Sequence, residues 1–426
     1  MRTDREIIKG KEGIKMKAHR QQSLCKEKDW LTTWSQSQKG LGLFPINDNG
    51  HTVSYQIPIQ NKGEKVRISL GNYYGETPVE IGGITVSTQK DIGFKKVTVS
   101  KAATCIIDAA ATIKTDVIDL SVVAGDTLYL RIYYAEQDEA NRTVSGSIFG
   151  IKPQRFELGN YTESDDYAID STFIDEFTND PYAMKFAQEF GQAKERCTMT
   201  VQGVDVYTTT HAHTIVAFGD SITEQNHWVG PLQQKVRDEA KNQYSLVNAG
   251  ISGNRLLKRI AMLPRRAQYF GLSGVERFEH DVFEVNANVS TVIVSLGVND
   301  IHQPGTDVFF PIEELPMFEE MVAGFEKLIE IAHQHGSRII LATVSPFIGY
   351  AKDVKNEKKE KLRQDINTWI RQNDLSDGYY DFDSILADEA NHSELVLKYD
   401  SGDKLHPSAK GGQAIVELIN VDELLG

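Results

Sequence analysis

The sequence predicts two domains: an antiparallel β-sandwich in the first half and an α/β domain with a doubly wound parallel sheet in the second. The 426 residues exceed the usual length of one domain, which is about 100–200 residues. Residues up to about 208 consist of short strand-like segments between turns, whereas strands and helices alternate from residue 212 onward. We therefore assign residues 29–208 to the sandwich domain and residues 212–426 to the α/β domain.

The segments expected to form the sandwich are short and rich in Val, Ile, Thr and Tyr, which favour strands. Turn sequences separate or precede several of them, such as NDNG at residues 47–50 and AGD at 124–126. Many short strands at this spacing are typical of an antiparallel sandwich. The expected strands are residues 53–59, 65–70, 79–86, 95–99, 115–122, 127–134 and 143–149.

Two charged segments lie at the borders of the sandwich domain. Residues 1–28 carry nine Lys or Arg against four Asp or Glu. We expect this basic leader to be poorly ordered, as a surface arm, a frayed terminus or an extension ahead of a natural start at Met16. Residues 160–190 form an acidic connector, interpreted either as a solvated link with a short helix or as a loop that shapes a binding cleft. Its candidate stacking residues are Tyr167, Phe173, Tyr182 and Phe186.

In the second half, an apolar strand at residues 214–218 is followed by a helical pattern at 228–240. Later strand and helix patterns alternate in the same way, which indicates a parallel sheet covered by helices. Ligands of such sheets bind at the carboxyl ends of the strands. The later strands are expected at residues 245–247, 291–296, 338–343 and 379–382, and the helices between them at 317–333 and 358–370.

The composition argues against several classes of partner. The formal net charge of −14 is opposite to the basic face that nucleic-acid binding requires. No apolar run approaches the length of a membrane span, so no membrane partner is expected. Cys25, Cys105 and Cys197 are widely spaced and form neither a disulfide framework nor a CxxC metal site. Because the N-terminus also lacks the apolar core of a secretory signal, we expect a reducing, cytoplasmic location.

Four polar blocks stand where chemistry is expected. GDSIT at residues 219–223 follows the first strand, NAGISGN at 248–254 the second and GVND at 297–300 the third, while DKLHP at 403–407 lies near the C-terminus. Each block alone is a weak signal, because Ser, Gly, Asn and Asp are common turn residues. Together they supply a hydroxyl nucleophile, backbone and amide donors, and an Asp/His pair.

These residue types fit nucleophilic catalysis. The Ser221 hydroxyl is a poor nucleophile until an imidazole such as His406 takes its proton, and Asp403 is placed to fix the tautomer of that ring. The tetrahedral intermediate carries an oxyanion, which needs preorganised donors. The expected donors are the backbone amides of Ser221 and Gly253 and the side chain of Asn299.

The four blocks resemble those of the SGNH, or GDSL, hydrolase family, over about residues 214–420. The resemblance implies a flavodoxin-like three-layer α/β/α domain and assigns the same roles to Ser221, Gly253, Asn299, Asp403 and His406. One departure is Ile222 where the motif has Leu, an apolar exchange. The sandwich domain is similar to a β-domain that precedes some SGNH esterases, through WLTTW at residues 30–34 and VRISL at 66–70. The α/β-hydrolase family is disfavoured, because the serine block lacks the second glycine of G-x-S-x-G.

Several of these residues also have an ordinary structural interpretation. Ser221 would make a good helix cap, Asn299 a turn residue and His406 a packed histidine. Asp220 and Asp300 are interpreted as structural turn or capping residues rather than acids. The joint occurrence of the four blocks favours the catalytic roles for Ser221, Asn299 and His406.

The remaining candidates are weaker. His227 and Trp228 either line the substrate pocket or, for Trp228, pack the first helix. His211 and His213 alternate along a strand, yet no third ligand follows at a recognisable spacing, so no metal is expected. No phosphate-binding glycine loop occurs after a strand, and no cofactor is expected.

The sequence thus predicts a serine esterase that acts without metal or cofactor, on a small-molecule or oligosaccharide ester. We expect it to remove small acyl groups, acetyl in particular, from a sugar, because a β-domain and an acidic-aromatic segment accompany the catalytic half. The alternatives are a lipid-directed esterase, lysophospholipase or thioesterase of the same family, and a non-catalytic carbohydrate-binding protein.

Overall fold

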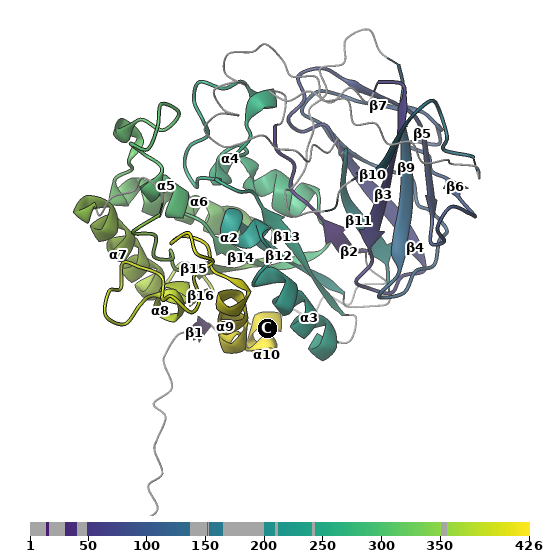
Figure 1. Cartoon of the computed structure of the whole chain (residues 1–426). Helices are drawn as coiled ribbons and strands as arrows, with labels where there is room; N and C mark the ends of the chain where they lie inside the picture. Colours follow the sequence, from purple (N-terminus) through teal and green to yellow (C-terminus); the bar gives the residue numbers. More distant parts are fainter. Residues whose placement is uncertain are drawn as a thin grey trace, which may run out of the picture.

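The protein is described by a computed structural model that covers residues 14–16, 30–40, 49–136, 151, 153–164, 200–208, 212–240, 243–350 and 356–426. The predicted fold class is confirmed. Antiparallel β-sheets form a sandwich-like N-terminal domain, and a parallel sheet with helices follows it (Figure 1).

The sandwich contains two antiparallel sheets, with strand orders β10-β3-β9-β5-β6 and β2-β11-β4-β8, and β7 pairs with β5. Alternate residues of β3 face the core of the sandwich, as Val53, Tyr55 and Ile57 do. The strands are β2 (Trp30–Ser35), β3 (His51–Pro58), β4 (Lys65–Gly71), β5 (Val79–Ser87), β6 (Lys95–Lys96), β7 (Cys105–Ile107), β8 (Thr112–Lys114), β9 (Thr127–Tyr134), β10 (Pro153–Leu158) and β11 (Val201–Tyr207).

Five of the sandwich strands, β3, β4, β5, β6 and β9, lie where the sequence predicts them, and β9 coincides with the predicted 127–134. The strands β2, β7, β8, β10 and β11 were not predicted. The prediction for residues 115–122 is wrong: this stretch makes only isolated bridges, between Ile118 and Val66 and between Val122 and Gly63. The predicted strand 143–149 and residues 165–190 of the connector lie outside the described residues. Of the basic leader, the structure describes only β1 (Ile14–Met16), which pairs antiparallel with β16 of the second domain.

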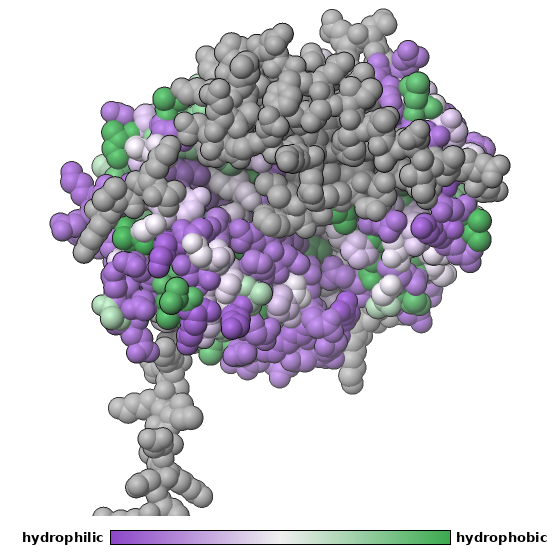
Figure 2. All heavy atoms as spheres, in the orientation of Figure 1, coloured by the Kyte–Doolittle hydropathy of each residue, from purple (hydrophilic) through white to green (hydrophobic). Residues whose placement is uncertain are grey.

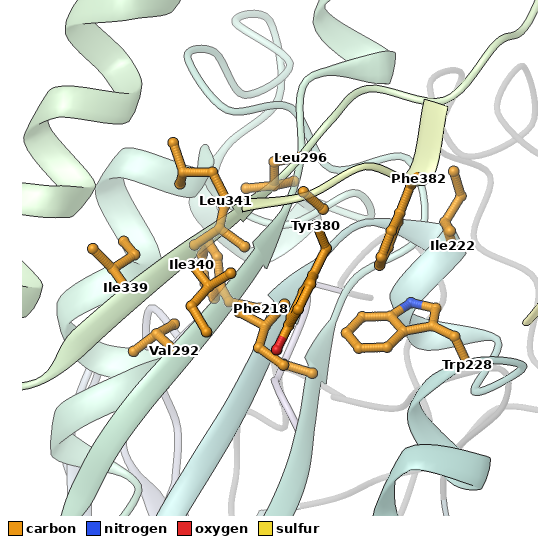
Figure 3. Packing of buried hydrophobic residues seen from close by; sticks show 14 of the residues in the cluster. Phe218, Ile222, Trp228, Val292, Leu296, Ile339, Ile340, Leu341, Tyr380 and Phe382 are labelled. Carbon is orange, nitrogen blue, oxygen red and sulfur yellow. The ribbon is translucent and has the colours of Figure 1, made fainter. Parts of the chain in front are cut away.

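The second domain has the strand order β13-β12-β14-β15-β16, with β1 at the edge beside β16. The five parallel strands follow the 2-1-3-4-5 order of flavodoxin-like folds. Helices cover both faces of a parallel sheet, so its strands are apolar throughout, as at Ile339, Ile340 and Leu341 (Figure 3). The strands are β12 (His213–Gly219), β13 (Tyr244–Gly250), β14 (Val289–Ser295), β15 (Arg338–Ala342) and β16 (Gly378–Tyr380).

The helices of this domain lie on two sides of the sheet, with α3, α9 and α10 on one side and α4 and α6 on the other (Figure 1). In α6, Met321, Phe325, Leu328 and Ala332 recur at helical spacing and are buried against the sheet. The helices are α2 (Ser221–Glu224), α3 (Val229–Ala240), α4 (Gly274–Phe278), continued by a π-helical turn at Glu279–Glu284, α5 (Val298–His302), α6 (Phe318–Gln334), α7 (Glu357–Gln372), α8 (Phe382–Leu386), α9 (Ala409–Leu418) and α10 (Val421–Leu425).

The two domains share buried hydrogen bonds through β2. Thr32 is fully buried: its amide donates to Thr214 Oγ1, its hydroxyl oxygen accepts from the Ala287 amide, and its carbonyl accepts from Ser245 Oγ. Just beyond β2, Gln36 forms a parallel bridge with Asn248 of β13. Because unpaired buried polar groups are costly, these bonds hold the domains in one orientation.

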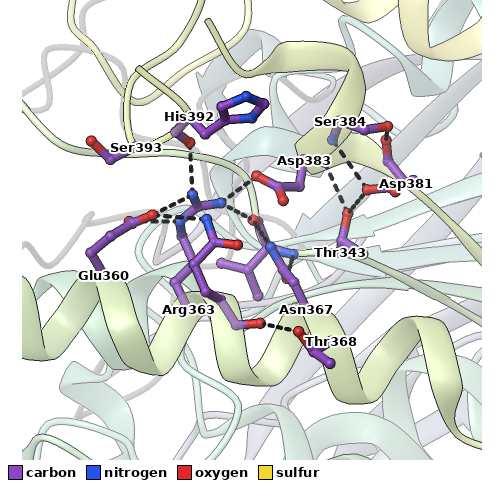
Figure 4. Close-up of polar contacts among 12 residues, drawn as sticks. Thr343, Glu360, Arg363, Asn367, Thr368, Asp381, Asp383, Ser384, His392 and Ser393 are labelled. Atoms are coloured by element: carbon purple, nitrogen blue, oxygen red, sulfur yellow. Dashed lines mark hydrogen bonds and ion pairs between the residues drawn. The ribbon is translucent and has the colours of Figure 1, made fainter. Parts of the chain in front are cut away.

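A buried charge cluster supports the loops after β15 and β16. Arg363 of α7 is fully buried and contacts Asp383 of α8 at 2.5 Å and Glu360 at 2.7 Å (Figure 4). It also donates to the carbonyl oxygens of Val344 and His392. A planar guanidinium can satisfy several acceptors at once, so one side chain fixes α7, α8 and two loops relative to one another.

Candidate active site

Ser221, His406 and Asp403 meet at the carboxyl edge of the parallel sheet. Ser221 Oγ lies 2.7 Å from His406 Nε2, and Asp403 Oδ2 accepts from His406 Nδ1 at 2.5 Å. The carboxylate therefore selects the tautomer that leaves Nε2 free to accept the serine proton. This is the geometry of a Ser-His-Asp triad, in which the hydroxyl is activated by a neighbouring base.

The histidine is held by a tight turn after residue 400. Asp403 Oδ1 accepts from the backbone amides of Leu405 and His406, and Lys404 has a left-handed φ of 73°. Behind this turn, His227 Nδ1 donates to the Pro407 carbonyl at 2.8 Å. The histidine is thus fixed by contacts from both sides of its loop.

These contacts keep Asp403 ionised. Burial by itself would raise the pKa of this carboxyl, but hydrogen bonds from the His406 ring and from the amides of His406 and Leu405 hold its pKa well below the usual range. An ionised Asp403 can stabilise the imidazolium that forms when His406 takes a proton.

Ser221 is the first residue of α2, and the side chain that caps this helix belongs to Asp220. Asp220 Oδ1 accepts from the Ile222 amide at 3.0 Å. The capping role is therefore filled, and the Ser221 hydroxyl faces the histidine instead. Burial raises the pKa of Asp220 to about 7.

The raised pKa of Asp220 predicts a pH dependence of stability. A carboxyl whose pKa is higher in the folded state stabilises the fold fully below its unfolded value of about 3.9, and this contribution is lost as the pH rises to about 7. Asp220→Asn keeps the capping oxygen and removes the titration. We expect the free energy of unfolding of this variant, relative to the wild type, to increase between pH 4 and pH 8 in urea denaturation.

Asp300 is present in both proteins, and its pKa is raised to about 6 by burial; because its charge also raises the pKa of Asp220, the two carboxyls titrate as an interacting pair in the wild type. Parallel stability profiles for the two proteins would show that Asp220 does not titrate in this range.

Of the predicted oxyanion residues, Gly253 lies in the loop after β13 and Asn299 lies in α5, which follows β14; these two strands are on either side of β12. Gly253 has a φ of +74°, and a Cβ there would lie 2.3 Å from the Phe270 ring, so glycine is required. Gln303, the C-cap of α5, donates from Nε2 both to the Gly253 carbonyl and to Asn299 Oδ1, each at 3.0 Å, and so links the Gly253 loop to α5. The sequence analysis missed Gln303, which carries no local signal.

The amide of Asn299 is oriented by its neighbours. Its Nδ2 donates to the Asn254 carbonyl at 3.0 Å, and its Oδ1 lies 3.2 Å from His302 Nε2. Burial lowers the pKa of His302 to about 3, so this ring is neutral. The amide group has two hydrogens on Nδ2, and only one of them is used for the Asn254 carbonyl. The second hydrogen can therefore be donated to an oxyanion.

Arg277 is a second residue that the sequence analysis missed. This fully buried arginine of α4 donates to the carbonyls of Gly219 and Ala249, at 2.8 and 3.0 Å, and to Asn254 Oδ1 at 2.9 Å. It thereby ties the ends of β12 and β13 to the loop that contains Gly253. In sequence it resembles any arginine of an amphipathic helix.

The weaker candidates lie elsewhere. Trp228 is only 1% exposed and packs edge-on against Phe382 in the core, so the prediction that it lines a pocket is replaced by the packing alternative (Figure 3). His227 contacts the His406 loop, as described above. His213 lies beside Tyr244, and His211 is outside the described residues.

Within the described ranges, no group of three His, Cys, Asp or Glu side chains is arranged to hold a metal ion. In the same part of the chain, no helix has the length and apolar character needed to cross a membrane.

The second domain is similar to a known protein family. The model of the GDSL-like Lipase/Acylhydrolase family matches residues 217–414, a range that contains all five residues of the triad and the predicted oxyanion hole. No curated protein matches the chain.

Among solved structures, a G-D-S-L family protein from Desulfitobacterium hafniense DCB-2 is 20% identical, with a TM-score of 0.35, over 50% of this chain and 99% of that one. Axe2, an acetylxylan esterase from Geobacillus stearothermophilus, is 19% identical, with a TM-score of 0.36, over 49% of this chain and 94% of that one. The C-terminal half of this chain therefore contains a GDSL-like lipase/acylhydrolase (SGNH) domain, which follows N-terminal antiparallel β-sheets.

Proposed function

We propose that the protein is a serine esterase that removes small acyl groups, acetyl in particular, from a sugar or oligosaccharide. The observation that carries the esterase part is the Ser221–His406–Asp403 geometry, with 2.7 and 2.5 Å between successive members. The cytoplasmic location and the sugar substrate are predictions from the sequence.

In this proposal, His406 Nε2 removes the Ser221 proton as Oγ attacks the ester carbonyl. The oxyanion accepts from the amides of Ser221 and Gly253 and from Asn299 Nδ2. Collapse of the intermediate breaks the bond to the alcohol, which leaves with the proton from His406. Water, deprotonated by the same ring, then hydrolyses the acyl-enzyme and restores the serine.

A cavity of mixed polar and apolar lining borders the last residue of the nucleophile helix, and none of Ser221, His406, Asp403, Gly253 or Asn299 lines it. A space of about 380 Å³ lies between the two domains and reaches Glu224 of α2. Its lining includes Trp34 from the sandwich and Arg237 from α3, together with the amide side chains of Gln60, Asn226, Gln233 and Asn248.

A chain-length series tests the acyl group. We expect kcat/KM for 4-nitrophenyl esters to be highest for acetyl and at least about tenfold lower for octanoyl, because a pocket built for a small group excludes extra methylenes. Acetate release from acetylated oligosaccharides, measured with Ser221→Ala as a blank, tests whether the alcohol part of the ester is a sugar. Preference for octanoyl esters or thioesters, with no acetate released from the oligosaccharides, would establish the lipid-directed alternative.

A further inference from the structure

A lysine of the sandwich domain is buried inside the catalytic half. Lys39 follows β2 and is only 2% exposed. The segment around it is anchored on both domains: Gln38 Nε2 donates to the Gly71 carbonyl, and the Gly40 amide donates to the Gln268 carbonyl. A Cβ at residue 40 would lie within 2.7 Å of backbone atoms of residues 265–268, so the chain is pressed closely onto the catalytic domain.

Lys39 contacts the helix that begins with the nucleophile. Its Nζ lies 3.5 Å from Glu224 Oε1, and both side chains are almost fully buried. Glu224 stands one helical turn after Ser221 on α2. The Lys39 ammonium also lies 4.8 Å from the centre of the Tyr269 ring. A buried carboxylate needs a partner of opposite charge, and Lys39 provides one.

The other carboxylate oxygen of Glu224 holds the loop of the predicted oxyanion hole. Glu224 Oε2 accepts from the Ser252 amide at 2.6 Å and from the Ser252 hydroxyl. Ser252 immediately precedes Gly253. One side chain therefore connects the helix of the nucleophile to the loop of an oxyanion donor.

We propose that Lys39 and Glu224 are a positioning pair for the oxyanion hole, so that the sandwich domain completes the catalytic site. This inference rests on the role proposed above for the Gly253 amide. The ammonium of Lys39 holds the buried Glu224 side chain in place, and the carboxylate then fixes Ser252 and, through the chain, the direction of the Gly253 amide. Oxyanion donors act only when they are preorganised, and a displacement of about 1 Å can reduce turnover about 100-fold.

The first test is Lys39→Met, which keeps the length of the side chain and removes its charge. We expect kcat per active site to fall about 10- to 100-fold with KM changed less than about threefold, because the transition state depends on the oxyanion donors more than the ground state does. Titration of active sites with a covalent inhibitor corrects for any unfolded fraction. A boronic acid that forms a tetrahedral serine adduct should lose affinity in proportion to kcat.

The double variant Lys39→Met/Glu224→Gln separates positioning from packing. The glutamine oxygen can still accept from the Ser252 amide, and no buried charge is left without a partner. We expect the double variant to fold at least as well as Lys39→Met and to regain at least about tenfold of the lost kcat. If Lys39 only filled space, the second substitution would restore nothing.

Lys114→Met is the matched control. Lys114 is another sandwich lysine that bonds across the domain contact, to the Val285 carbonyl at 3.3 Å, and it pairs with Asp205 at 3.0 Å. We expect this variant to lose stability but to keep its kcat per active site. An unchanged kcat in Lys39→Met, in an enzyme that Ser221→Ala inactivates, would overturn the positioning role and leave the esterase proposal intact. If the Ser221→Ala variant hydrolysed the ester as fast as the wild type, the esterase proposal itself would be overturned.

Discussion

Replacing Ser221 with alanine should lower kcat by about 10⁴- to 10⁶-fold, with little change in KM. The reason is geometric: Oγ lies 2.7 Å from the only ring nitrogen of His406 that Asp403 leaves free, so no other hydroxyl can take over the attack. The measurement is steady-state hydrolysis of 4-nitrophenyl acetate. Because the triad acts as a unit, Ser221→Ala combined with His406→Ala should be no less active than Ser221→Ala alone.

Ser384→Ala is the matched control for the nucleophile. Ser384 lies in α8 after β16, and its hydroxyl donates to the Asp381 carbonyl at 3.2 Å (Figure 4). The Ser384→Ala variant should retain wild-type kcat. Hydrolysis that continues unchanged in Ser221→Ala would mean that another group attacks the ester, and the assigned mechanism would be wrong.

The largest effect on stability is expected at Arg277. Arg277→Leu should lower the free energy of unfolding by about 3–5 kcal/mol, because it removes the arginine partner of a buried carboxylate, which then keeps only its hydrogen bond with His280. That carboxylate is Asp281, which is 2.7 Å from Arg277 Nη1. Burial by itself would raise the pKa of Asp281, but hydrogen bonds from His280 and the charge of Arg277 hold the pKa below its usual value. Urea denaturation at pH 7 measures the loss.

A second arginine provides the control for this stability effect. Arg266 pairs with Glu76 of the sandwich domain at 2.6 Å, but the two side chains are 40% and 39% exposed. Exposed ion pairs contribute about 0–1 kcal/mol, so Arg266→Leu should cost far less than Arg277→Leu. Equal losses in the two variants would show that burial of Arg277 has no energetic consequence.

The coloured part of the face in Figure 2 is mainly hydrophilic, with hydrophobic residues scattered over it. The sequence prediction of a cleft formed by Tyr167, Phe173, Tyr182 and Phe186 concerns residues outside the described ranges and stays a prediction.

Regular elements were predictable where local pattern and burial agree. The strand β9 and the helix α6 follow their hydrophobic periods, and the sequence analysis located both within one residue. Residues 115–122 carry the same strand-forming side chains but make only isolated bridges. Propensity cannot tell a paired strand from an extended connection, because the pairing depends on partners far away in the chain.

The sequence by itself determined the fold class and the chemical inventory of the site. Strand and helix periods are local, and the polar blocks with Ser221, Gly253, Asn299 and His406 directly follow predicted elements or stand in a turn of their own. Local patterns suffice here because each block lies within a few residues of the element that positions it.

Only the tertiary structure decided which buried charges serve the site. Lys39 and Glu224 are separated by 185 residues, and Arg277 bonds to carbonyls up to 58 residues away. In sequence, such residues look like the charged positions of any solvated helix or loop. Their roles arise from desolvation and from partners that the fold brings together, and neither property is encoded in a local pattern.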